Sequence, residues 1–331
     1  MNKNLLFQEF LSKNFDENNC STLINEIREI TFQLNRDNIS RTSAYLYYYL
    51  RNPEIKWAFL ASMVSRNAGY NMCDLASPAF QTIIPKAKRE MFYLAYEHAN
   101  WLIFHDAFPQ LMIYYYSKKI GKPLFSLLPQ FTVSQFMAKE WEWFWNRKDE
   151  KRLLQALIIN EQNVIQNPIL KHRKYKKRVF RSLLFYIQDQ FHFSFIVFPT
   201  LNGDLFGSSV KNFKRVHSRI VLGNLLSEIL FHPNLYADFL RFAKKVEHTG
   251  SRWDYEKYLR KSFSSETPVW KTIYAIVDHS IEKRGDWFDE TKIIDKWFHP
   301  STMNKPILLT DWIYKKHLQI QSFAKWKRLF S

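Results

Sequence analysis

The sequence predicts an all-α protein, a compact multi-helix globular fold, and three observations favour this class. Apolar residues recur at helical spacing along most of the chain, for example at Leu23, Ile27 and Ile30. Only 7 of the 331 residues are glycine, too few for the many positive-φ turns of sandwiches and barrels. Apolar residues make up 46% of the chain, which is enough to fill a core.

Capping and helix-breaking residues give approximate helix boundaries. Pro53 suits a first helical turn, and Gly69 and Gly121 suit helix ends. Pro109 is expected to force a boundary or kink, because proline has no N–H to donate within a helix. The expected helices lie at about 21–30, 40–50, 53–67, 86–108, 109–121, 132–148, 149–166, 169–190, 211–231, 233–249, 252–263, 268–284, 290–298 and 310–330.

One stretch differs from the helical pattern. Residues 191–200, FHFSFIVFPT, are aromatic and partly alternating, and the turn-rich LNGDLFGSS follows them. They predict one short strand or buried extended segment. The sequence has no internal repeat and no flexible linker, so we expect residues 1–331 to form a single helical unit. A weak subdivision would fall at 122–131 or 199–210.

Cysteine content and hydropathy predict a cytoplasmic protein. Cys20 and Cys73 lie far apart, whereas a secreted chain more often carries a disulfide framework. The N-terminal MNKNLLFQEF has too short an apolar run for a signal peptide. No stretch approaches the roughly 18 apolar residues of a membrane span.

The formal net charge of +17 is unevenly distributed. Residues 1–100 hold 11 of the 48 basic and 10 of the 31 acidic side chains, a net charge of +1, so the rest of the chain carries +16. This asymmetry indicates an anionic partner for the C-terminal two-thirds: nucleic acid, an acidic protein or a lipid surface. An ordinary solvated basic surface is the alternative.

The densest charge lies at 171–181, KHRKYKKRVFR, which contains no acidic residue. Its cations predict a non-enzymatic binding protein that contacts the phosphates of nucleic acid or of another anionic polymer. A solvated face is again the alternative. The expected anion-binding residues are Lys171, Arg173, Lys174, Lys176, Lys177, Arg178 and Arg181.

A second hypothesis is an enzyme or ligand-binding protein with a buried polar pocket. The predicted 53–67 helix is apolar nearly all round but ends in Arg66 and Asn67. A buried guanidinium needs a carboxylate, which we expect to come from Asp74, Glu97 or Asp106. Either a structural ion pair or a binding pocket fits this pattern. The pocket candidates are Arg41, Arg66, Asn67, Asn71, Asp74, Glu97, His98, His105 and Asp106.

The sequence predicts no metal site and no cofactor. His98 and His105 lie two helical turns apart, roughly 10 Å, too far to hold one metal ion. Carboxylate–histidine spacings elsewhere are as frequent as chance predicts. No Walker loop, dinucleotide fingerprint or nucleophile elbow is present around Gly203 and Gly207. Gly207-Ser208-Ser209 is expected at a helix N-terminus, as a serine cap or a phosphate-binding turn.

The C-terminal helix is basic and amphipathic. Its apolar side contains Trp312, Ile313, Ile320, Phe323, Trp326 and Phe330. We expect this side to dock on the protein body. Peripheral attachment to a membrane surface is a third, less favoured hypothesis.

Two segments carry a family resemblance. NISRTSAYLYYYLRNPEIKWAFLASMVSRNAGYNMCDL, residues 38–75, and HTGSRWDY, residues 248–255, resemble the YppC-like family of uncharacterised proteins from bacilli. The resemblance implies a bacterial cytoplasmic protein and supplies no activity. It adds His248, Arg252 and Asp254 to the pocket candidates.

Overall fold

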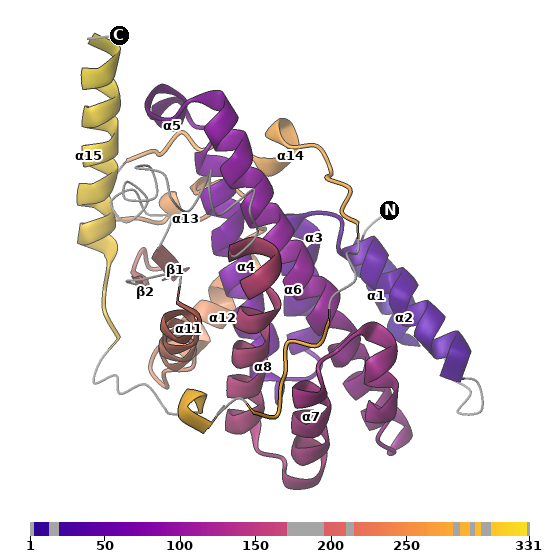
Figure 1. The fold of residues 1–331 in the computed structure, drawn as a ribbon. Helices are drawn as coiled ribbons and strands as arrows, with labels where there is room; N and C mark the ends of the chain where they lie inside the picture. Colours follow the sequence, from indigo (N-terminus) through magenta and orange to yellow (C-terminus); the bar gives the residue numbers. More distant parts are fainter. Residues whose placement is uncertain are drawn as a thin grey trace.

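Helix α4, Lys56–Asp74, lies in the middle of the helical body, with α3, α6, α8 and α11 packed around it (Figure 1). The computed structural model describes residues 3–12, 20–170, 195–209, 215–261, 263–280, 285–291, 295–298 and 306–329. Most of these residues are helical, and one two-stranded antiparallel sheet accompanies them, which confirms the all-α class.

The helices vary widely in length. The N-terminal part contains α1 Lys3–Ser12, α2 Cys20–Leu34, α3 Asn38–Tyr49, α4, α5 Pro78–Ile83, α6 Lys86–Ile120, α7 Gln135–Arg147 and α8 Glu150–Val164, with a 3₁₀ helix at Phe125–Phe131 and a π-helical turn at Gln166–Leu170. The C-terminal part contains α11 Val216–Leu230, α12 Tyr236–Lys245, α13 Trp253–Glu256, α14 Trp270–Ile273, a 3₁₀ turn at Asp295–Trp297 and α15 Thr310–Leu329.

Helix α6 is continuous, so the boundary expected at Pro109 is wrong. Proline inside a helix costs about 3 kcal/mol because one hydrogen bond is lost and its ring crowds the preceding turn. Here Phe108, Leu111 and Met112 are completely buried around Pro109. Their burial offsets the local cost, since each large apolar side chain contributes about 1.5–3 kcal/mol.

The helices expected at 252–263, 268–284 and 290–298 are also wrong as continuous helices, because single turns are the helical structure that the described residues of these ranges form. Contacts to other segments occupy the chain instead. The Trp270 N–H donates to the Thr249 carbonyl at 2.8 Å, and the Tyr274 hydroxyl donates to the Met72 carbonyl at 2.6 Å. Residues 274–280 therefore follow the helical body without helical structure of their own.

The extended segment near 191–200 is confirmed as strand β1, Phe195–Pro199, which pairs with β2, Leu205–Ser209. Asn67 of α4 holds this sheet, because its amide donates to the Val197 carbonyl at 2.7 Å and accepts the Val197 N–H at 2.8 Å. Ser208 pairs with Ile196 inside the sheet, so the helix N-terminus expected at Gly207-Ser208-Ser209 is wrong.

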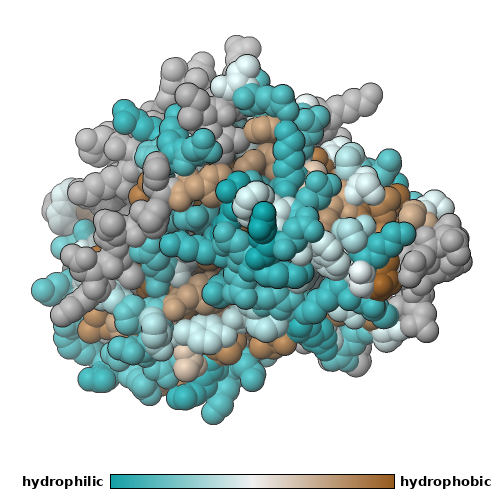
Figure 2. Space-filling view, turned by 90° about the horizontal axis from the view of Figure 1, so that it is seen from below, coloured by the Kyte–Doolittle hydropathy of each residue, from teal (hydrophilic) through white to brown (hydrophobic). Residues whose placement is uncertain are grey.

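The face of the molecule seen from below is hydrophilic over most of its area (Figure 2). Apolar side chains appear there in separate small groups. The large apolar side chains lie inside, where Trp57, Phe59, Phe104 and Trp141 are almost completely buried. That residues 1–331 form one unit stays a prediction.

Candidate functional site

Helix α4 is longer than the sequence predicts and carries a polar stripe into the core. It continues past Gly69 to Asp74, so Arg66, Tyr70 and Asp74 follow one another at helical spacing. All three side chains are buried. Polar groups in such a place need partners, and residues 246–256 supply them.

Arg66 is 3% exposed, and four groups surround its guanidinium. Its Nε donates to the Tyr70 hydroxyl at 2.8 Å, and one terminal nitrogen donates to the carbonyls of Val246 and Glu247 at 2.7 and 2.8 Å. The same nitrogen lies 3.5 Å from the Asp254 carboxylate. Arg66 therefore has the buried carboxylate partner that we expected, but its partner is Asp254 and not Asp74, Glu97 or Asp106.

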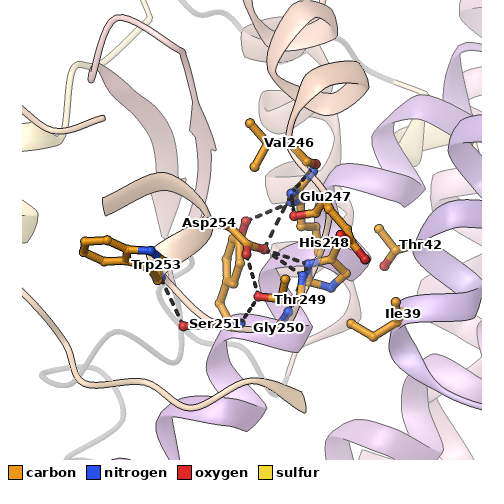
Figure 3. A network of polar contacts seen from close by, with 12 residues as sticks. Ile39, Thr42, Val246, Glu247, His248, Thr249, Gly250, Ser251, Trp253 and Asp254 are labelled. Atoms are coloured by element: carbon orange, nitrogen blue, oxygen red, sulfur yellow. Dashed lines mark hydrogen bonds and ion pairs between the residues drawn. The ribbon is translucent and has the colours of Figure 1, made fainter. Parts of the chain in front are cut away.

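Asp254 closes the turn that contains the HTGSRWDY motif. In Figure 3 its carboxylate points back across the turn toward Thr249 and His248. It accepts the Thr249 N–H at 3.0 Å and the Thr249 hydroxyl at 2.5 Å. The pKa of Asp254 is lowered, because these donors and the Arg66 and His248 side chains outweigh its burial. Asp254 thus joins the turn to α4.

His248 is packed directly against Gly69. Its Nε2 lies 2.8 Å from the Asn38 side-chain oxygen, and its Nδ1 lies 3.4 Å from both the Asp254 carboxylate and the Gly250 nitrogen. Burial lowers the pKa of His248 to about 4, so its ring is neutral near pH 7. A Cβ atom on Gly69 would lie 2.7 Å from His248 Nε2. Gly69 is therefore the point of close approach and not the helix end that we predicted.

Arg252 and Asp74 form the second ion pair of the network. The Arg252 Nε lies 2.9 and 2.8 Å from the two carboxylate oxygens of Asp74, and its terminal nitrogens donate to Asn71 and Tyr255 at 2.9 and 2.8 Å. The structure thus gathers seven of the candidates around the C-terminal half of α4. They are Arg66, Asn67, Asn71, Asp74, His248, Arg252 and Asp254.

The other five candidates belong to separate clusters. Arg41 and Glu97 form a buried ion pair at 2.5 Å, and His98 stacks on His279 with ring centroids 5.2 Å apart. His105 stacks on Trp101 at 5.0 Å. Asp106 accepts hydrogen bonds from the amides of Gln110 and Asn160 at 2.8 and 2.6 Å. Within the described chain, Arg66 and Glu97 therefore belong to different clusters.

A small cleft opens beside the Arg252–Asp74 pair. The sequence analysis missed three of its polar residues, Glu256, Ser265 and His317, because they come from segments with no local spacing signal. Phe80, Phe195, Val197, Phe263, Ile313 and Ile320 are among its apolar residues. The cleft has a volume of about 30 Å³, enough for a small chemical group.

Glu256 is the unusual residue of this cleft. It is 5% exposed, and within the described chain its Oε1 atom has no hydrogen-bond partner. Its other oxygen accepts the Ser265 N–H at 3.2 Å. Burial raises the pKa of Glu256 from 4.5 to about 7, against the lowering effects of Ser265 and Arg252. An unsatisfied buried oxygen of this kind costs about 1–3 kcal/mol.

A basic surface lies where α15 docks on α5. Its cations are Lys86, Lys88, Arg89, Lys325, Lys327 and Arg328. Ile313, Ile320 and Ala324 of α15 are buried, which confirms that the helix docks. Phe323 and Trp326 are 40% and 56% exposed, so the expectation that the whole aromatic side makes the contact is wrong.

The basic segment 171–181 lies outside the described residues.

Two classes of site are not observed in the described chain. No group of three or more His, Cys, Asp or Glu side chains there is placed to hold a metal ion. None of the helices described is both long enough and apolar enough to cross a bilayer.

Comparison with known proteins gives the family. The model described as "Protein of unknown function (DUF2515)" matches residues 33–312. This chain belongs to that family. It is also 47% identical over 301 residues to the uncharacterized protein YppC of Bacillus subtilis (strain 168). The aligned region covers 91% of this chain and 93% of YppC. The resemblance noted in the sequence is thus confirmed. No solved structure matches.

The family range includes all of α4, the HTGSRWDY turn and Glu256. It ends at residue 312, so most of α15, including His317, lies beyond it. The buried polar network is therefore formed entirely by residues within the family range, whereas the cleft and the basic surface also use α15.

Substitution of Gly69 by alanine tests the close approach of His248. The new Cβ atom would lie 2.3 Å from the Asn38 side-chain oxygen and 2.7 Å from His248 Nε2. We expect the free energy of unfolding to fall by about 1–3 kcal/mol, measured by urea denaturation. Gly285→Ala is the matched control, because no atom of the described residues lies within 4 Å of its new Cβ atom. Equal stability of the two variants would contradict this packing.

The raised pKa of Glu256 predicts a pH-dependent stability. The protonated carboxyl is favoured in the folded state, so its contribution is complete below pH 4.5 and is lost as pH rises through about 7. Arg252 and Asp74 are the charged groups that face it. Relative to wild type, Glu256→Gln should therefore gain about 3 kcal/mol of stability between pH 4.5 and pH 8. Urea denaturation at both pH values measures this change, and a constant difference between the two proteins would contradict the assignment.

Proposed function

We propose that this protein is a non-enzymatic binding protein for an anionic polymer, and that this polymer is nucleic acid. The observation that carries the proposal is the meeting of cations from two distant segments, the α5–α6 junction and the last turns of α15. Segment 171–181 adds seven further cations in the sequence, and its contribution stays a prediction. The charge of the whole chain, +17, favours the same class of partner.

Two hydrogen bonds fix the geometry of this basic surface. Lys327 donates to the Ile83 carbonyl at 3.0 Å, and Arg328 donates to the Thr82 hydroxyl at 3.0 Å. The C-terminal end of α15 is thereby held beside α5, which leads directly into α6 (Figure 1). Cations from both segments consequently lie at the same end of the molecule.

The charge of this surface is strongly one-sided. Lys86, Lys88 and Lys325 are exposed, and they join Arg89, Lys327 and Arg328. Over residues 78–90 and 315–329, Glu90 is the one carboxylate in the sequence. Lysine and arginine side chains in such numbers bind phosphates without sequence preference, and release of counterions from the polymer provides the free energy.

Trp326 favours nucleic acid over other anionic polymers. Its ring is 56% exposed and lies on the same helix as the cations. Bases stack on exposed aromatic rings, and each such contact contributes about 1–3 kcal/mol. The same residues also suit an anionic membrane surface, which is therefore an outcome that the experiment must separate.

The polar pocket hypothesis receives less support from the geometry. Arg66 and Asp74 bind Asp254 and Arg252, whereas Glu97 and His98 lie in another cluster. Since these groups satisfy one another, they offer few free contacts to a ligand. Their arrangement favours a structural role.

The salt dependence of binding tests the proposal. Each phosphate contact contributes a slope of about 0.9 for duplex DNA when log affinity is plotted against log salt concentration. Lys86, Lys88 and Lys325 replaced together by Ala should flatten the slope by about two to three units. The variant Lys174, Lys176, Lys177 and Arg178→Ala should flatten it by about three to four units. Fluorescence anisotropy of labelled duplex and single-stranded oligonucleotides measures both.

A matched control removes cations from other parts of the protein. Lys122, Arg147 and Lys151 are exposed, and the last two flank the turn between α7 and α8, far from α15 in Figure 1. Their replacement by Ala should leave the slope unchanged, and thermal melts should show that all variants fold. Absence of binding at low salt, or equal slopes in all proteins, would overturn the proposal. Binding to phosphatidylserine vesicles without binding to oligonucleotides would replace it with the membrane hypothesis.

A further inference from the structure

Two aromatic rings stay at the surface of α15 although the helix is docked. Phe323 and Trp326 are 40% and 56% exposed, whereas Ile320 and Ala324 on the same helix are buried. The two rings are nearly parallel, with an angle of 21° between their planes and 6.0 Å between their centroids. Docking therefore buries the apolar side chains beside these rings and leaves the rings themselves partly in contact with water.

Positive charge lies along α15 on both sides of the rings. Lys316 comes seven residues before Phe323, which is about two helical turns and roughly 10 Å along the axis. Lys315 comes eleven residues before Trp326, about three turns, so it lies on the same helix face as that ring. Lys327 follows the rings at once, and the helix has no acidic residue beyond its first turn. The rings are thus placed between cations.

Aromatic rings between cations are typical of surfaces that hold single-stranded nucleic acid. Bases stack on the rings, while lysine and arginine side chains contact the phosphates along the strand. In a duplex the faces of the bases are covered by neighbouring base pairs, so a ring on a helix surface cannot stack on them. A duplex can therefore contact the cations of such a surface but cannot use its rings.

We propose that the basic surface prefers single-stranded nucleic acid over duplex, with Phe323 and Trp326 as the platform on which unpaired bases stack. This inference rests on the proposed binding of nucleic acid and adds the kind of strand that is recognised. The cations contribute to binding of both kinds, whereas the rings supply the preference. The two contributions differ in their salt dependence, because stacking itself releases no counterions.

The docked position of α15 disfavours a membrane surface as the partner of these rings. A helix that lies in a membrane interface places its apolar face roughly 5–10 Å into the boundary of the bilayer. In α15 that face, with Ile313, Ile320 and Ala324, is buried against the protein. Lys327 and Arg328 hold the helix beside α5, so it would have to leave the body before it could enter a membrane.

Binding of a single strand and of a duplex by the full chain tests the preference. The probes are labelled oligothymidylate of about 16 nucleotides, which does not pair with itself, and the same strand annealed to oligoadenylate. Fluorescence anisotropy at low salt gives both dissociation constants, and a salt titration gives both slopes. We expect wild type to bind the single strand about tenfold more tightly than the duplex, or better.

The variant with both Phe323→Leu and Trp326→Leu removes the rings and keeps apolar side chains of good helix propensity. It should bind the single strand about tenfold more weakly than wild type, with an unchanged salt slope, and the duplex like wild type. Trp326→Phe retains an aromatic ring and should keep most of the preference. If the double variant does not fold, each single Leu variant should still lose about threefold in affinity for the single strand.

Trp143→Leu is the matched control. Trp143 is 45% exposed, and the centre of its ring lies 4.9 Å from the Arg152 guanidinium, so it is another exposed ring beside a cation. It belongs to α7, which lies far from α15 in Figure 1. This variant should bind both probes like wild type, and thermal melts should show that every variant compared is folded.

The results separate this inference from the proposed function. Equal losses for single strand and duplex, or no loss for either, would overturn the preference, while flattened slopes of the charge variants would still support binding of nucleic acid. Absence of binding to both probes would overturn the preference together with the proposed function. Binding to phosphatidylserine vesicles that the double variant loses, without binding to oligonucleotides, would assign the rings to a membrane surface instead.

Discussion

A guanidinium group inside a helical body must have its donors and its charge satisfied, because an isolated buried charge costs several kcal/mol. Arg66 imposes this requirement on the protein. Tyr70 on its own helix meets one part of it, and the carbonyls of Val246 and Glu247 with the Asp254 carboxylate meet the rest. The position of residues 246–254 is therefore determined by a residue that precedes them by about 180 positions in the chain.

The contacts of Arg66 also affect the chain at both ends of residues 246–254. Helix α12 ends at Lys245, where the following carbonyls turn toward Arg66. The turn that Asp254 closes then brings Arg252 to Asp74, and Glu256 follows one turn later. The Glu256 Oε1 atom has no donor among the described residues, and the Arg252–Asp74 pair lies beside the turn that contains it.

Local sequence signals predicted some of these features and not others. Helical periodicity identified α4, α15 and the two parts of α6 on either side of Pro109, and the aromatic alternation identified β1, because each depends on neighbouring residues. The burial of Arg66 could be predicted from the apolar helix around it, but its partner could not, since that choice depends on how distant segments fold together. The helix end predicted at Gly69 was wrong for the same reason. A helix end and a close approach both favour glycine, and only the position of His248 distinguishes them. Glu256 gave no signal, because nothing in WDYE reveals which carboxylate lacks a donor.

The central claim is that the Arg66–Asp254 pair holds the C-terminal segment on α4, and a double-mutant cycle tests it most directly. The cycle compares the free energies of unfolding, from urea denaturation, of wild type, Arg66→Met, Asp254→Asn and the double variant. Each single change should cost about 3–5 kcal/mol, because it leaves a buried group without its partner. The double variant should be less destabilised than the sum of the two by about 2 kcal/mol or more. Additive effects, within about 0.5 kcal/mol, would show that the two residues act independently and would contradict this account.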